Sequence, residues 1–137
     1  MNRKPRILIV DDEELVRRSY ARLLSGAHCN TEAALNGEDA LHAMARERFD
    51  VILLDLRMPG PDGMTVLKSI KEKWPESEVV VITGYPTIET AKEAVRLGAY
   101  DYLAKPVDPD KVILAAHGAA LRKRWALHQE YRERSTQ

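Results

Sequence analysis

Five short apolar stretches, most of them rich in β-branched residues, recur along the chain and are separated by longer segments. We predict strands over residues 7–10, 30–35, 51–54, 79–82 and 100–103, of which the stretch at 30–35 is the weakest. Continuous apolar runs are typical of strands that are buried on both faces, as in a parallel sheet.

Segments with helical spacing follow these stretches. Four of them carry stripes that repeat every three or four residues, which are Val16, Tyr20 and Leu23; Ala40, Met44 and Glu47; Val66, Ile70 and Trp74; and Ile88, Ala91 and Val95. Thr87 is the expected N-cap of the last of these helices, and Gly98 is its expected C-terminal stop. Repeated β–α units predict an α/β fold, with one doubly wound five-stranded parallel sheet and helices on both of its faces.

The composition fits one compact domain with a real core, since 45% of the 137 residues are hydrophobic and 31% are charged. Lysine and arginine together number 21, the same as aspartate and glutamate. A domain that binds nucleic acid through its phosphates usually carries a basic excess. The balance therefore argues against nucleic-acid binding by this stretch.

Cys29 is the only cysteine, which excludes a disulfide within the chain and is consistent with a reducing compartment. The four histidines show no zinc-like spacing with one another or with Cys29, so we expect them to be structural or solvent-facing; they are His28, His42, His117 and His128. The basic residues 1–6 precede an apolar run of only four residues, too short for a signal peptide or a membrane span. We expect a cytoplasmic protein without a membrane partner.

Polar residues that could take part in binding or catalysis directly follow four of the predicted strands. Asp11 and Asp12 follow the first, Asp55 the third, Thr83 the fourth and Lys105 the fifth. Each alone has an ordinary explanation as a helix cap, a turn former or a solvated charge. Together they converge on the carboxyl edge of one sheet, where such folds bind ligands. Clustered carboxylates need a cation, and Mg²⁺ is the natural one, so the set suits phosphoryl transfer to a carboxylate.

The order of these residues resembles receiver domains of two-component response regulators. The shared pattern is Asp-Asp after the first strand, Asp-x-x-Met-Pro-x-x-x-Gly from Asp55, Thr83, and Lys-Pro at Lys105, and it covers residue 6 to the early 110s. The resemblance implies the flavodoxin-like (CheY-like) strand order 2-1-3-4-5. The segments 83–87 and 91–103 are similar to receivers of enhancer-binding (NtrC-like) transcription activators.

By this resemblance, Asp55 accepts a phosphoryl group from a sensor histidine kinase. Asp12, Asp55 and the backbone carbonyl of Arg57 would ligate Mg²⁺, while Asp11 would act directly or through water. Lys105 would contact the phosphoryl group, and its bond to the following proline would be cis.

Thr83 and Tyr102 resemble the family's switch pair. When the phosphoryl group draws Thr83 inward, Tyr102 would move into the vacated space and change the face made by the fourth helix, the fifth strand and the fifth helix. That face would then control an output domain or a downstream protein, in transcription regulation. Arg57 and Tyr85 border the site in the family, and because both are large we expect slow hydrolysis of the aspartyl phosphate.

The last helix is predicted to begin after the N-cap Asp108 and to run beyond the domain. Its apolar face carries Leu114, Leu121, Trp125 and His128, and Gly118 weakens it by roughly 1 kcal/mol relative to alanine. We therefore divide the chain into a receiver domain, residues 1–120, and a helical extension, residues 121–137. The extension is either a dimer contact or a linker into an output domain, with a solvated tail as the alternative. Its length favours a protein that continues beyond Gln137.

Three other classes fit less well. An aspartyl-nucleophile phosphohydrolase of the haloacid-dehalogenase type needs a second aspartate two residues after the nucleophile, where Asp55 is followed by Arg57 and Asp11 by Glu13. A nucleotide or flavin binder needs a Gly- or Ser/Thr-rich loop after the first strand, where this chain has four acidic residues, 11–14. An interaction module that has lost phosphorylation would not keep the whole residue set. We expect a phosphoacceptor switch rather than an enzyme.

Overall fold

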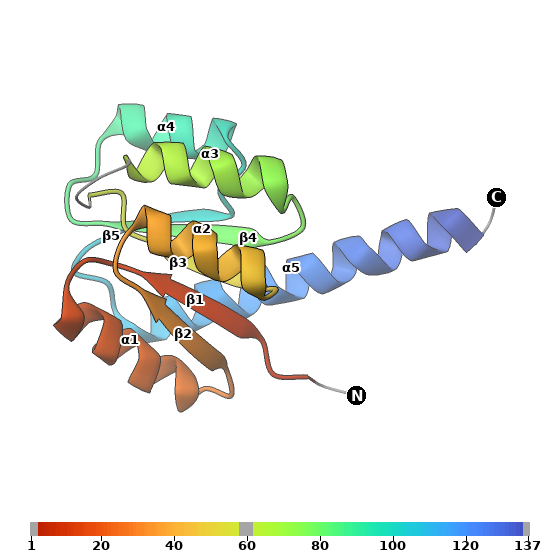
Figure 1. Ribbon diagram of the computed structural model, residues 1–137, viewed down its shortest axis with the longest axis horizontal. Helices are drawn as coiled ribbons and strands as arrows, with labels where there is room; N and C mark the ends of the chain where they lie inside the picture. Colours follow the sequence, from red (N-terminus) through yellow and green to blue (C-terminus); the bar gives the residue numbers. More distant parts are fainter. Residues whose placement is uncertain (1–2, 58–61, 136–137) are drawn as a thin grey trace.

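The computed structural model describes residues 3–57 and 62–135, with side chains as far as Lys123. Five parallel strands form one sheet in the order β2-β1-β3-β4-β5, as predicted. The strands are β1 (Arg6–Val10), β2 (Asn30–Ala34), β3 (Val51–Leu54), β4 (Glu78–Thr83) and β5 (Asp101–Ala104). The helices are α1 (Glu14–Ser25), α2 (Gly37–Arg46), α3 (Gly63–Lys73), α4 (Ile88–Arg96) and α5 (Pro109–Ser135) (Figure 1).

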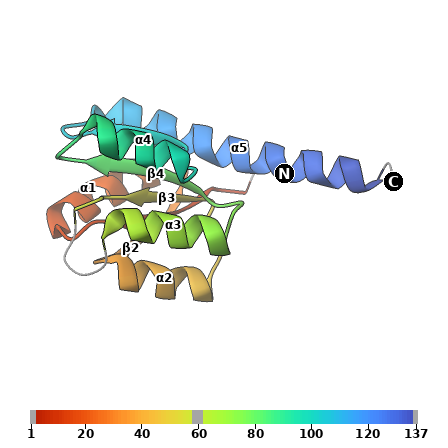
Figure 2. The ribbon, with the colours of Figure 1, turned by 90° about the horizontal axis from the view of Figure 1, so that it is seen from above.

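Helices cover both faces of the sheet, as Figure 2 shows for α2 and α5 on opposite sides. Alternate residues of β1 serve the two cores: Leu8 and Val10 pack in the layer of α2, α3 and α4, whereas Ile7 and Ile9 pack in the layer of α1 and α5. Because both faces are covered, β1, β3 and β4 are buried along almost their whole length, which explains their continuous apolar runs.

Only β3 has its predicted bounds; the other four strands differ by one residue at one or both ends, with β1 beginning at Arg6 and β2 ending at Ala34. The strand β4 includes Glu78 and Thr83, one residue beyond the apolar run at each end. The strand β5 begins at Asp101 rather than Tyr100, although the Tyr100 N–H donates to the Val79 carbonyl oxygen at 2.7 Å. Polar residues at strand ends carry no hydrophobic signal, so the pattern alone places these boundaries only approximately.

The predicted helix caps are confirmed. The Thr87 side chain accepts a hydrogen bond from the Thr90 N–H in a capping box, and Gly98 follows α4 with a φ of 98°. Before α5, the Asp108 carboxylate accepts from the N–H of Asp110 at 3.1 Å.

The stripe that marked α4 in the sequence does not face the core. Ile88 and Val95 are 71% and 68% exposed, and the buried residue of the helix is Ala94. An alanine at the contact lets α4 approach closely, so its larger apolar side chains lie at the surface. The face of α4, β5 and α5 is therefore partly apolar.

The helix α5 packs on the sheet with its first half and then projects beyond it (Figures 1 and 2). Small residues line its buried side, including Ala115, Ala116 and Ala119, while Leu114 and Leu121 are exposed. The side chains of Trp125 and His128 lie outside the described residues. A Cβ at Gly118 would lie 2.6 Å from the Tyr100 hydroxyl oxygen. The glycine, expected to be only a mild weakness, is thus where Tyr100 packs against α5.

Within the two described ranges, we find no helix that is both long and apolar enough to cross a membrane.

Candidate functional site

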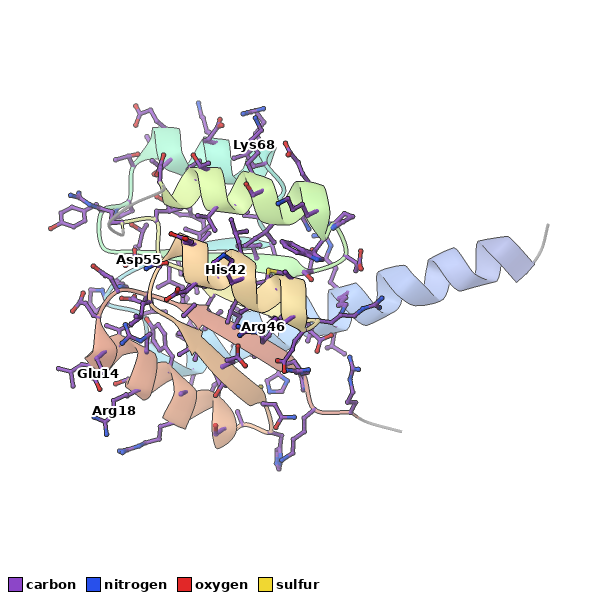
Figure 3. The ribbon with its side chains drawn as sticks, viewed as in Figure 1. Glu14, Arg18, His42, Arg46, Asp55 and Lys68 are labelled. Carbon is purple, nitrogen blue, oxygen red and sulfur yellow. The ribbon has the colours of Figure 1, made fainter. Side chains whose placement is uncertain are left out.

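The predicted site residues meet at the carboxyl edge of the sheet, where Figure 3 shows Asp55 at the end opposite to the projecting part of α5. Backbone hydrogen bonds continue the parallel ladder just past the strands and fix these positions. The N–H of Asp11 donates to the Ala34 carbonyl at 3.2 Å, and the N–H of Asp55 donates to the Val10 carbonyl at 3.0 Å. Lys105 donates its N–H to the Thr83 carbonyl at 2.8 Å, and its bond to Pro106 is cis, as expected.

Lys105 bridges two buried carboxylates. Its Nζ lies 2.9 Å from Asp11 Oδ2 and 3.4 Å from Asp55 Oδ2. Asp11 is only 2% exposed and Asp55 only 6%. The ammonium group of Lys105 therefore pairs with two carboxylates that are 44 positions apart in the sequence. The parallel topology of the sheet brings these two carboxylates together.

Backbone N–H groups fix the second oxygen of each carboxylate. Asp11 Oδ1 accepts from the N–H of Glu13 at 2.9 Å, and Asp55 Oδ1 accepts from the N–H of Arg57 at 3.1 Å. These short-range bonds are turns of the kind that aspartate makes at strand ends. Each carboxylate is thus held in one orientation before any ligand arrives.

The charges of the site are strongly coupled. Burial raises the pKa of the Asp55 carboxyl above its ordinary value; the Arg57 N–H and Lys105 oppose this rise. The neighbouring charge of Asp11 adds to it. Burial works against the charge of Lys105, but Asp11 and Asp55 together still raise the pKa of the ammonium. A raised carboxyl pKa means that Asp55 would gain from positive charge beyond what Lys105 supplies.

Three carboxylates offer ligand atoms for a cation. Oxygen atoms of Asp11, Asp12 and Asp55 lie within 4.8 Å of one another, the one such group of three or more potential ligands among the described residues. Two of the three side chains are buried and Asp12 is exposed. An all-carboxylate set that remains open on one side fits a hard divalent cation such as Mg²⁺, which keeps some of its waters.

Cys29 and His117 also lie close together, which their sequence spacing did not predict. Cys29 Sγ is 3.8 Å from His117 Nε2, and this nitrogen lies 2.8 Å from the Ala27 carbonyl oxygen. Burial raises the pKa of the Cys29 thiol, so it stays protonated. The pair therefore joins α5 to the turn before β2 as a structural contact.

Thr83 and Tyr102 lie on the neighbouring strands β4 and β5. Thr83 is 1% exposed, and its hydroxyl oxygen accepts from the N–H of Tyr85 at 3.2 Å. Tyr102 is partly buried against the core layer of α4, and its hydroxyl lies 2.5 Å from the Thr90 hydroxyl oxygen. The two residues are thus both tied to the segment that leads into α4.

Arg57 and Tyr85 stack beside Asp55 at the carboxyl edge of the sheet. The guanidinium carbon of Arg57 lies 3.9 Å from the centre of the Tyr85 ring. They border a surface hollow of about 640 Å³ that extends past Thr83 to Thr87 and Thr90. The stack therefore forms part of the wall of this hollow.

Sequence reasoning missed two residues at the site. The Arg17 guanidinium donates to the Asp11 carbonyl oxygen at 2.8 Å. Burial raises the pKa of the Tyr20 phenol, with smaller effects from the charges of Lys105, Asp11 and Asp55, which places this ring near the site. Both residues lie on α1, the helix that directly follows Asp11. Their short distance from Asp11 along the chain was the one sequence signal that they could reach the site. The Met58–Pro59 part of the motif lies outside the described residues.

Comparisons with known proteins agree with this geometry. The family model of the response regulator receiver domain matches residues 7–117. The regulatory protein AtoC of Escherichia coli is 43% identical over 114 residues, which are 83% of this chain and 25% of AtoC. The DNA-binding transcriptional regulator NtrC of Escherichia coli is 38% identical over 107 residues, or 78% of this chain and 23% of NtrC.

A solved receiver domain gives the same picture. The crystal structure of the receiver domain of NtrX from Brucella abortus has a TM-score of 0.79 and 40% identity, and the match covers 83% of this chain and 97% of that one. The chain spans about a quarter of the length of the curated relatives that it matches.

Proposed function

Because the chain belongs to the response regulator receiver family, we propose that Asp55 is the residue that takes up the phosphoryl group in two-component signalling. The predicted similarity to receivers of NtrC-like enhancer-binding activators is confirmed by its relatives. One observation carries the proposal for the site. Lys105 Nζ contacts both Asp11 and Asp55 at the carboxyl edge of the sheet, so an acceptor carboxylate, a cation ligand and a positive charge share one place.

The proposed reaction transfers the phosphoryl group from a phosphohistidine of a sensor kinase. A carboxylate oxygen of Asp55 attacks phosphorus, the new P–O bond forms, and the P–N bond breaks as the imidazole leaves. Two side chains of this chain then stabilise the transferred group: Lys105 pairs with one phosphoryl oxygen and Thr83 donates its hydroxyl hydrogen to another. Both reach the carboxyl edge of the sheet beside Asp55, which we call the acceptor edge, from neighbouring strands.

We assign the cation site to Asp12, Asp55 and the backbone carbonyl of Arg57, with Asp11 acting directly or through water. When bound, Mg²⁺ supplies positive charge that offsets the repulsion between the carboxylate and the incoming phosphoryl group. The fit rests on the cluster of carboxylate oxygens and on the raised pKa of the buried Asp55 carboxyl.

The proposed output is a change of the face formed by α4, β5 and α5. Ile88 and Val95 of α4 and Leu114 and Leu121 of α5 are exposed there, so the face carries apolar area that a partner can cover. Tyr102, on the strand between the two helices, would move with Thr83 and alter this area. We propose that the face controls an output domain or a downstream protein in transcription regulation, in the cytoplasm.

The extension of α5, residues 121–137, would connect this receiver to that output or pair with a second copy. Support comes from the course of the helix, which continues beyond the sheet to Ser135 (Figure 1). We propose a phosphoacceptor switch that assists its own phosphorylation and dephosphorylation, rather than an enzyme with an external substrate. Arg57 at the second position after Asp55 is the residue that argues most against an aspartyl phosphohydrolase.

The chemical nature of the product tests this function. Incubation with labelled acetyl phosphate and Mg²⁺, followed by neutral hydroxylamine, distinguishes an acyl phosphate from a phosphate ester, since only the former is cleaved. We expect label that forms with Mg²⁺, fails to form with a chelator, and is released by hydroxylamine. Label that resists hydroxylamine would place the phosphoryl group on a hydroxyl, such as that of Thr83, and refute the proposal.

A further inference from the structure

The hydroxyl of Tyr102 is bound to the first turn of α4. It lies 2.5 Å from Thr90 Oγ1 and accepts a second, longer bond from the N–H of Thr87 at 3.4 Å. Thr90 is only partly exposed, and Tyr102 is partly buried against the core layer that holds Ala94. The tyrosine is therefore fixed at its polar end by a side chain as well as by packing along its ring.

Thr90 also belongs to the cap of α4. The side chain of Thr87 accepts from the N–H of Thr90 at 3.0 Å, and Thr90 Oγ1 accepts from the N–H of Thr87 at 3.3 Å. The two hydroxyl oxygens are 2.9 Å apart. Most capping boxes use glutamate or glutamine at this third helical position, where the side chain reaches only the backbone. A threonine hydroxyl here reaches the backbone of Thr87 and the phenol of Tyr102 together.

Three residues lie between Thr83 and Thr87, the N-cap of α4. The Thr83 hydroxyl oxygen accepts from the Tyr85 N–H at 3.2 Å, so the start of the loop depends on Thr83 and its end depends on the cap of α4. A ligand that draws the Thr83 hydroxyl elsewhere removes one fixed point of the loop. The loop is then held only at its other end, by the cap of α4 that also contacts Tyr102.

We propose that Thr90 is a positioning residue of the switch: its hydroxyl holds Tyr102 at the N-terminus of α4 in the unphosphorylated state and releases it when Thr83 moves. The inference rests on the proposed function of Asp55 and Thr83. It adds to that function the Thr90 hydroxyl as the group that holds Tyr102. We call this hydrogen bond between Thr90 and Tyr102 the catch. The catch stabilises the unphosphorylated state only, whereas a cap of α4 would stabilise both states. Its loss therefore shifts the equilibrium toward the phosphorylated state.

The experiment measures the affinity for beryllofluoride, a mimic of the acyl phosphate, at saturating Mg²⁺ by titration calorimetry. The variants are Thr90→Val, which keeps the shape and removes the hydroxyl, Tyr102→Phe, and both together. One neutral hydrogen bond is worth roughly a 2- to 10-fold change in an equilibrium constant. We expect each single variant to bind beryllofluoride more tightly by roughly that factor, and the double variant to match the singles because the bond can be lost only once.

Two further variants separate a catch from a cap. Thr90→Ser keeps the hydroxyl and should retain the wild-type affinity, and Thr65→Val, at an exposed threonine of α3, should leave it unchanged. A pure capping role predicts a lower melting temperature for Thr90→Val with unchanged affinity, and that result would overturn the catch. Additive effects of Thr90→Val and Tyr102→Phe would overturn it as well, since they would show that the two hydroxyls act separately. Failure of the wild-type protein itself to bind beryllofluoride would refute the proposed function, and the catch with it.

Discussion

Lys123 Nζ lies 2.8 Å from Asp50 Oδ1, and this ion pair joins the middle of α5 to the start of β3. Both side chains are almost wholly buried, at 8% and 4% exposure. The N–H of Arg6 donates to Asp50 Oδ2 at 2.7 Å. Burial opposes the charge of Asp50, but these partners and Arg3 still lower the pKa of its carboxyl below the ordinary value. The pair sits at the other end of the strand that leads to Asp55, where α5 leaves the sheet.

Lys123→Met should therefore be costly, because it leaves a buried carboxylate without its closest cation. We expect the free energy of unfolding to fall by about 3 kcal/mol, as is usual when one partner of a buried pair is removed. Urea unfolding measures this loss. Lys111→Met, at an exposed lysine of the same helix, is the matched control and should change stability by less than about 0.5 kcal/mol. Equal effects of the two substitutions would mean that the ion pair does not hold α5.

Gly63→Ala should disturb the acceptor edge through a steric clash. A Cβ at Gly63 would lie 2.5 Å from Leu56 Cα and 2.7 Å from the Leu56 carbonyl oxygen, and backbone atoms cannot give way as a side chain can. We expect a loss of about 1–3 kcal/mol in unfolding free energy, the usual range for overpacking. Gly26→Ala is the control, since the nearest atom to its Cβ would be the Leu23 carbonyl oxygen, 3.5 Å away. Denaturant unfolding of both variants decides, and a tolerated Gly63→Ala would contradict the close approach of α3 to the residue after Asp55.

Gly118→Ala sets helix propensity against packing. Alanine favours the helix by about 1 kcal/mol, but its Cβ would lie 2.6 Å from the Tyr100 hydroxyl oxygen. We expect the substitution to lower the melting temperature in the wild-type background. With Tyr100→Phe the nearest ring carbon is 3.5 Å away, so the same substitution should then raise it. Thermal unfolding of the four proteins measures this reversal, and a stabilising effect in both backgrounds would show that Tyr100 does not occupy the groove at Gly118.

The stack of Arg57 on Tyr85 should slow hydrolysis of the aspartyl phosphate. An exposed cation–π contact is worth about 0.5–1 kcal/mol. If the stack has to open for water to reach Asp55, its removal corresponds to roughly 2- to 5-fold faster hydrolysis. Tyr85→Ala should show this increase in the decay of the phosphorylated protein, while Tyr85→Phe keeps an aromatic face and should decay like the wild type. An unchanged rate in Tyr85→Ala would show that the stack does not slow hydrolysis of the aspartyl phosphate.

The fold and the acceptor edge followed from the sequence because their signals are local. Each of Asp11, Asp55, Thr83 and Lys105 stands at the end of a predicted strand, and the parallel topology then brings those ends together. The strand order itself came from the resemblance of these residues to a known family, since no hydrophobic pattern specifies which strands are neighbours.

The remaining contacts depend on side-chain geometry that a sequence pattern does not encode. Asp50 and Lys123 are 73 positions apart, and neither charge signals burial. Thr90 has the sequence context of an ordinary helical residue, and its bond to Tyr102 requires the spacing of α4 from β5. The exposure of Ile88 and Val95 was hidden for a related reason: a short helix has too few turns to show which side the sheet covers.

The most direct test of Asp55 as the acceptor is the intact mass of the protein after incubation with acetyl phosphate and Mg²⁺, beside an Asp55→Asn variant. We predict a gain of one phosphoryl group in the wild type, its loss when Mg²⁺ is chelated before incubation, and no gain in the variant. The asparagine keeps the shape of the side chain, so folding of the variant can be checked by its melting temperature. A phosphoryl group on the folded variant, or none on the wild type, would contradict the assignment of Asp55.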